Sequence, residues 1–240
     1  MCYHYSVPNI DGLRDRFHAY IDPPSSFNRI YHVSGFSRPK LPVITTENPA
    51  RIQFLIWGLI PHWVKDDAIA EKFRTRTLNA RAETLYEKAS FRHLVERNRC
   101  LVLADGFFEW RHYKGRTYPY YITLKNQQPF AFAGLWDAWQ PPNLPEVEKT
   151  YTIITTKANT LLEQVHNKRK RMPVILSPEH EQSWLTPELS QPEIDALLSA
   201  YKPERMQAHP VSRLITAKGV QTNLPDAIQP KEYADLPGLT

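Results

Sequence analysis

The stretch CLVLADGFFEWRHYKGRTYPYYITLKNQQPFAFAGLWDAW (100–139) decides the fold, because apolar and aromatic residues fill it almost from end to end. The turn signals KGR and NQQP interrupt the apolar pattern and indicate separate strands. Cys100 begins the first apolar run and is expected to be a small buried residue. The pattern predicts strands at 100–104, 107–113, 117–124 and 130–139, with the last three forming a meander.

The rest of the chain alternates short strands with short helices. An Asn9-capped helix carries Ile10, Leu13, Phe17 and Tyr20 at helical spacing, while the polar, basic segment 64–79 is expected to run over the surface. Further strands are predicted at 2–7, 30–34, 42–46, 52–58, 150–156, 172–176 and 206–212, and further helices at 82–97, 159–165, 178–185 and 191–201. This order predicts a single α+β domain over 1–240, with a mostly antiparallel, barrel-like core, flanking helices and a peripheral tail after about 216.

The composition excludes several classes of protein. The chain has two cysteines in 240 residues, which argues against a disulfide framework or a structural zinc site, and we expect no metal and no cofactor. Its apolar runs fall short of the ~20 residues of a membrane span, and no signal peptide precedes Cys2. We therefore expect a cytoplasmic protein with no membrane partner, a monomer that would be nucleoid-associated if bacterial, and the net charge of +5 permits an anionic ligand.

Cys2 directly follows the initiator methionine. Removal of Met1 would leave an α-amine and a thiol on neighbouring carbons, with ordinary pKa values of about 8 and about 8.5. Both groups are nucleophiles near neutral pH. Taken alone, however, the position is more typical of a strand residue that happens to be cysteine.

Four polar features lie in apolar surroundings, and each also has an ordinary structural explanation. Asn79 and Arg81 are two apart on an extended segment and so share one side, although a turn Asn beside a surface Arg is the commoner case. Glu109 lies between Phe108 and Trp110, where burial would make it a general acid, or it faces solvent on an antiparallel strand. His166 precedes the basic run 168–171, which is usually a solvated loop.

The loop WGLIPHW (57–63) is the fourth feature. Trp57 is expected in the core. Trp63, beyond the proline, is a candidate for an exposed aromatic residue that stacks on a base.

Together and in this order, these features resemble the SOS-response-associated peptidase family, the abasic-site processing proteins of bacteria and eukaryotes. The resemblance extends from residue 1 to roughly 215. Its motifs are the cysteine after Met1, WG-x-x-P, NARAET (79–84), DGFFEW (105–110), a His before RMPVIL (171–176), and HPVS (209–212).

The resemblance implies a protein that binds single-stranded DNA containing abasic sites and removes its own Met1. It implies that Cys2 then crosslinks to the sugar aldehyde as a thiazolidine, with possible strand cleavage by a lyase activity. It also implies the site residues. Cys2, Asn79, Glu109 and His166 would be catalytic, and Arg81, Trp63, Arg169, Arg171 and Ser212 would contact DNA.

The chain departs from the common family pattern in three places. Tyr3 and His4 follow Cys2 where Gly-Arg is common, and YHVSG (31–35) has His32 where an Asn is usual. Extra basic residues separate His166 from MPVIL.

Two other functions remain open from the sequence. An N-terminal-nucleophile amidohydrolase also exposes a cysteine behind Met1 and uses its α-amine as the base. A non-catalytic single-strand DNA-binding module would need only Arg81, Trp63 and the basic run 168–171.

Overall fold

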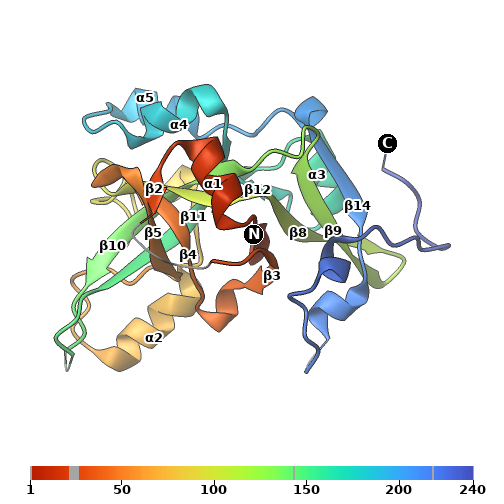
Figure 1. Ribbon diagram of the computed structural model, residues 1–240, viewed down its shortest axis with the longest axis horizontal. Helices are drawn as coiled ribbons and strands as arrows, with labels where there is room; N and C mark the ends of the chain where they lie inside the picture. Colours follow the sequence, from red (N-terminus) through yellow and green to blue (C-terminus); the bar gives the residue numbers. More distant parts are fainter. Residues whose placement is uncertain (1, 22–26, 143, 218, 240) are drawn as a thin grey trace.

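The computed structural model describes residues 2–21, 27–142, 144–217 and 219–239. It is an α+β protein built on two sheets (Figure 1). Its buried apolar residues form one main core, to which β7 and β10 contribute most of their length and β11 contributes Tyr151, Ile153 and Ile154. In the described part of the chain, no helix is long and apolar enough to cross a membrane.

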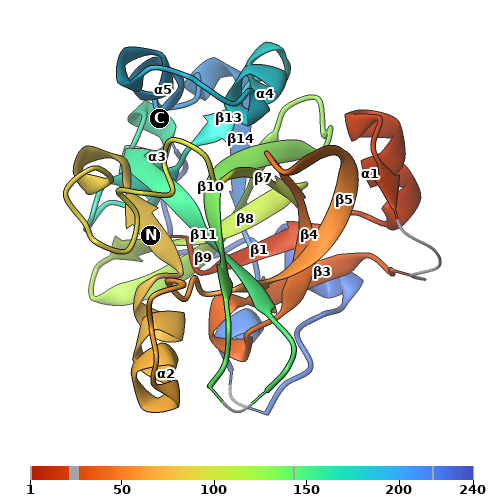
Figure 2. The same cartoon turned by 90° about the vertical axis from the view of Figure 1, so that its left-hand side faces the viewer.

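The larger sheet has nine strands and closes on itself. Along its main path the order is β12-β11-β10-β7-β4-β5-β2, and β5 returns to pair in parallel with β11 at Thr150↔Ile56 and Tyr151↔Trp57. Figure 2 shows the resulting ring of β4, β5, β7, β10 and β11, which confirms the barrel-like core. The bounds are β2 Tyr20–Ile21, β4 Lys40–Thr45, β5 Asn48–Trp57, β6 Asn79–Arg81, β7 Arg99–Ala104, β10 Phe130–Trp139, β11 Glu148–Lys157, β12 Arg171–Pro173 and β13 Ile175–Leu176.

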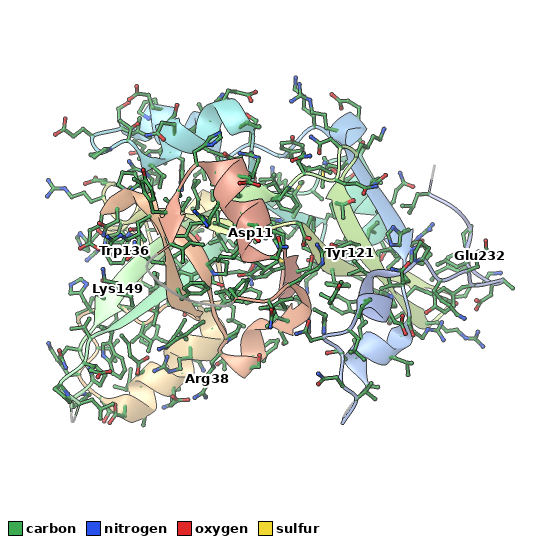
Figure 3. All side chains as sticks on the ribbon, in the orientation of Figure 1. Asp11, Arg38, Tyr121, Trp136, Lys149 and Glu232 are labelled. Atoms are coloured by element: carbon green, nitrogen blue, oxygen red, sulfur yellow. The ribbon has the colours of Figure 1, made fainter. Side chains whose placement is uncertain are left out.

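The smaller sheet has five antiparallel strands in the order β14-β9-β8-β1-β3. Their bounds are β1 His4–Val7, β3 Ile30–Ser34, β8 Gly106–Tyr113, β9 Arg116–Leu124 and β14 Met206–Pro210. Lys114 and Gly115, at the turn between β8 and β9, both have positive φ, as a tight two-residue hairpin requires. In Figure 3, Tyr121 marks this sheet, while Trp136 and Lys149 lie together on the larger one.

The predicted meander of 107–113, 117–124 and 130–139 is wrong in its pairing. β8 and β9 do form a hairpin, but β9 continues to β14, and β10 pairs with β7 of the larger sheet at Phe130↔Ala104. Both sheets bury side chains in the main core. The strands of residues 100–139 are therefore divided between the sheets, with β8 and β9 in the smaller one and β7 and β10 in the larger one. Gly106, at the start of β8, packs closely on Tyr121 of β9, because a Cβ there would lie 2.2 Å from the ring.

In the part of the chain that the structure describes, five helices surround the sheets: α1 Ile10–Phe17, α2 Asp67–Arg76, α3 Thr160–Val165, α4 Pro178–Leu185 and α5 Gln191–Leu197. Asn9 caps α1 as predicted, accepting a hydrogen bond from the amide of Gly12 at 3.0 Å. Short 3-10 turns complete the chain: η1 Gly35–Ser37, η2 Ala82–Thr84, η3 Pro203–Arg205, η4 Arg213–Thr216 and η5 Pro225–Ile228.

The helix that Asn9 caps is predicted to carry Tyr20, but it ends at Phe17 and Tyr20 lies in β2. Two further predicted segments differ from the structure. The segment 64–79 does cross the surface, but it contains α2, whose only buried residues are Ala70 and Arg74 and which therefore lacks an apolar stripe. The predicted helix 82–97 is instead η2 followed by turns, because its hydrogen bonds alternate between three- and four-residue spacing. Its apolar residues Leu85, Phe91, Leu94 and Val95 are buried nevertheless.

Candidate active site around Cys2

Cys2 lies two residues before the start of β1, with its side chain fully buried. Its thiol donates to the carbonyl oxygen of His4, with Sγ and O 3.6 Å apart. Burial is the largest influence on this thiol and raises its pKa far above the ordinary value. The thiol is therefore protonated at neutral pH. Met1 lies outside the described residues.

Asn79 reaches Cys2 from the other sheet. It begins β6, which pairs in parallel with β11 at Ile153↔Asn79. Its Nδ2 donates to the carbonyl oxygen of Cys2 at 2.9 Å. Its Oδ1 is buried and has no hydrogen-bond partner among the described residues. The amide thus holds the Cys2 main chain and leaves one acceptor for a further donor.

Glu109 is 2% exposed in the middle of β8, opposite Tyr120 of β9. The solvent-facing alternative is therefore wrong, because the strand is covered on both sides at this point. Burial raises the pKa of its carboxyl to about 7. At neutral pH a substantial fraction of Glu109 therefore carries a proton that it can donate.

His166 follows α3 directly and is 7% exposed. Its Nδ1 lies 2.8 Å from the carbonyl oxygen of Arg171 and 3.6 Å from Oε1 of Glu109. Since a carbonyl only accepts, Nδ1 carries the ring proton and Nε2 carries the lone pair of the neutral ring. Burial lowers the pKa of His166 to about 4, so the ring is neutral at pH 7.

Two exposed arginines flank this group. Burial raises the pKa of the Tyr3 hydroxyl, while the guanidinium charges of Arg169 and Arg81 act on it in the opposite direction. The charge of Arg169 also bears on Glu109 and His166. Arg81 and Arg169 are exposed and place positive charge close to these side chains.

The other residues predicted to contact DNA are held differently. Arg171 donates to Glu83 and to the main-chain oxygen of Thr155, each at 2.6 Å, so its guanidinium is bound to the protein. Trp63 is 42% exposed and meets the ring of Phe73 in α2 edge-on. Ser212 accepts from the amide of Leu214 at the start of η4. The described hydrogen bonds do not link Trp63 or Ser212 to Cys2.

The sequence interpretation missed Asn167. Its Oδ1 accepts from the amide of His112 at 3.0 Å, and its Nδ2 donates to the carbonyl of His112 at 2.8 Å. These two hydrogen bonds attach the loop after α3 to β8. They therefore help to hold His166, in the same loop, beside Glu109. The only signal in the sequence is an amide residue directly after the site histidine.

In the described part of the chain, no three His, Cys, Asp or Glu side chains are grouped as metal ligands would be. The side chains gathered around Cys2 are a carboxyl that is partly protonated at neutral pH, a neutral imidazole and an amide oxygen that has no hydrogen-bond partner among the described residues. Such a set transfers protons and supports a nucleophile.

The family model described as SOS response associated peptidase (SRAP) matches residues 1–218. The chain therefore belongs to this family. It is 41% identical over 211 residues to the abasic site processing protein YoqW of Bacillus subtilis, covering 86% of this chain and 88% of that one. It is 34% identical to the abasic site processing protein HMCES of Xenopus tropicalis, covering 66% of this chain and 52% of that one.

Solved structures agree with the fold. A crystal structure of a protein from Bacteroides thetaiotaomicron superposes with a TM-score of 0.90 at 36% identity, covering 96% of this chain and 100% of the other. A second, from Bordetella bronchiseptica, has a TM-score of 0.76 at 26% identity and covers 88% of this chain.

Proposed function

We propose that this protein processes abasic sites in single-stranded DNA by forming a covalent thiazolidine through Cys2 after Met1 is removed. One arrangement carries the proposal. The side-chain amide of Asn79 donates to the carbonyl of Cys2, and the buried acid Glu109 lies close enough for its charge to act on the Cys2 thiol. The three residues come from parts of the chain that are distant in sequence. The family membership and the abasic-site names of the relatives support the same function.

The protonated thiol sets the order of bond formation. Because burial keeps the pKa of the thiol high, the first nucleophile is the α-amine exposed by loss of Met1. The amine adds to the aldehyde carbon of the opened sugar, and loss of water gives an imine. The sulfur then bonds to the same carbon and its proton passes to nitrogen, which closes a five-membered ring. The intramolecular second step benefits from a high effective concentration.

Glu109 and His166 suit the proton transfers. An abasic sugar is mostly a closed hemiacetal, so opening it requires a proton on the ring oxygen. Glu109, with a pKa of about 7, can give that proton, and the lone pair on Nε2 of His166 can accept one from the attacking amine. The unpaired Oδ1 of Asn79 is an acceptor that can orient the amine without adding charge.

Arg81 and Arg169 would hold the phosphates on either side of the lesion, and Trp63 would stack on a neighbouring base. Self-removal of Met1 by the same proton-transfer groups belongs to this proposal.

The deciding experiment is the intact mass of the purified protein mixed with an abasic oligonucleotide and with an intact one of the same sequence. We expect a species equal to the protein without Met1 plus the abasic strand minus one water, and no adduct with intact DNA. Binding without any adduct would favour a DNA-binding module. Absence of both would reject the proposal.

A further inference from the structure

The side chain of His4, two residues after Cys2, is stacked on His32 of β3. The ring centroids are 5.0 Å apart with an interplanar angle of 5°, and Nδ1 of His4 lies 3.0 Å from Nε2 of His32. The ring of His4 also meets the edge of Trp110, which follows Glu109 in β8. His4 thus accepts a hydrogen bond from the Cys2 thiol through its main-chain carbonyl, and its ring contacts Trp110, the residue after Glu109.

The second nitrogen of His32 is bound to the C-terminal segment. Nδ1 of His32 lies 2.8 Å from Oγ1 of Thr222, and Oδ1 of Asn223 accepts from the amide of Tyr31 at 2.7 Å. Thr222 and Asn223 lie beyond residue 218, the last one that the family model matches. The C-terminal segment also contacts β3 through η5 (Figure 1).

This pair of histidines does not provide a cation for DNA. Burial lowers the pKa of His4 to about 3 and that of His32 to about 4, so both rings are neutral at pH 7. Nδ1 of His4 and both ring nitrogens of His32 therefore each take part in one hydrogen bond of the chain Thr222–His32–His4. The arrangement is typical of a network that fixes side-chain orientation.

The start of β1 is not paired with β8, so other contacts must hold it. β1 pairs with β8 only at Tyr5↔Phe107 and Ser6↔Gly106, so the residues before Tyr5 have no partner in β8. On the other side, they are held by the pairing of His4 with Ser34 and by the hydrogen bond from the amide of Gly35 to the carbonyl of Tyr3.

We propose that the C-terminal segment positions the active site, with Thr222 acting through His32 and His4 to orient Cys2 and Glu109. Thr222, His32 and His4 are positioning residues. The inference rests on the proposed crosslinking function, which supplies its kinetic readout.

The test compares Thr222→Val, which keeps the shape but removes the hydroxyl, with Thr222→Ser, which keeps the hydroxyl. Thr216→Val is the matched control, because the bond that Oγ1 of Thr216 makes within the described residues is to the carbonyl of Arg213 in its own turn. The crosslinking rate is measured against the concentration of abasic oligonucleotide. We expect Thr222→Val to lower the rate at saturation on the order of tenfold, as misplacement of reacting groups does. The half-saturating concentration should stay unchanged, and Thr222→Ser and Thr216→Val should behave as the wild type. An unchanged saturating rate in Thr222→Val would overturn the inference.

A second measurement does not depend on crosslinking. The ¹⁵N chemical shifts of the ring nitrogens of His4 and His32 report which nitrogen is protonated or hydrogen-bonded. Thr222→Val should shift the signals of both rings, whereas Thr216→Val should shift neither. If only His32 responds, the coupling to His4 is absent and the inference is wrong. If both respond but the wild type forms no adduct, the failure belongs to the proposed function.

Discussion

Nδ1 of His166 lies 3.6 Å from the carboxylate of Glu109, yet its proton is directed to the main chain of Arg171. With the pKa of Glu109 at about 7 and that of His166 at about 4, the two groups are both uncharged between those values. An acid and a base therefore lie side by side without forming an ion pair. This arrangement favours proton transfer to and from a substrate.

The rate of crosslinking should depend on the proton of Glu109. In the wild type the saturating rate should fall as pH rises through about 7, because the carboxyl loses the proton that opens the sugar. Glu109→Gln keeps the size but cannot donate an acidic proton, so its rate should be lower by about 100-fold and should lack this limb. Quench-flow gels from pH 5.5 to 8.5 measure both. If the rate of Glu109→Gln still fell as pH rises through about 7, the titrating group would be another residue.

The same burial predicts a pH-dependent cost in stability. The pKa of Glu109 is raised from 4.5 to about 7 on folding, so the folded state binds more protons between these values. Stability should therefore fall as pH rises from 4.5 to 7. Glu109→Gln should remove this cost and exceed the wild type in free energy of unfolding by up to about 3 kcal/mol at pH 8, with little difference at pH 4.5. Urea unfolding at both pH values measures it, with the exposed Glu146→Gln as the control.

The two nucleophiles of Cys2 should be separable. Cys2→Ala with Met1 removed keeps the amine, so it should form an imine that is trapped by borohydride but reverses without it. The wild type should give an adduct that persists without reductant, because the ring opens only when the thiol leaves. A denaturing gel with and without borohydride compares them. A stable unreduced adduct from Cys2→Ala would show that the bond forms at another residue.

The arginines should separate into two kinds. Arg81→Ala and Arg169→Ala should weaken binding of any single strand and each reduce the slope of log K against log salt by about 0.7, the value for one phosphate contact. Arg171→Ala should act mainly on stability, because its guanidinium is held by Glu83 and Thr155. Fluorescence anisotropy in a salt series, together with melting temperatures, provides both readouts. An equal loss of slope in Arg171→Ala would mean that DNA displaces Glu83.

Local patterns predicted much of this protein. The Asn9 cap, the strands of 100–139 and the buried positions of Leu85 and Val95 follow from signals within a few residues. The candidate site residues also stood out locally, as polar side chains in apolar surroundings. Their roles came from the family resemblance and remain proposals.

Strand pairing and the assembly of the site were decided only by the tertiary structure. Alternation along a strand shows that a face is covered but not which strand covers it, so the pairing of β10 with β7 rather than β9 could not be predicted. For the same reason, the burial of Glu109 and its approach to His166 depended on residues far away in the sequence. Thr222 shows this most clearly. A threonine in a segment without periodicity carries no local signal, and its link to His32 of β3 joins residues that are 190 positions apart in the sequence.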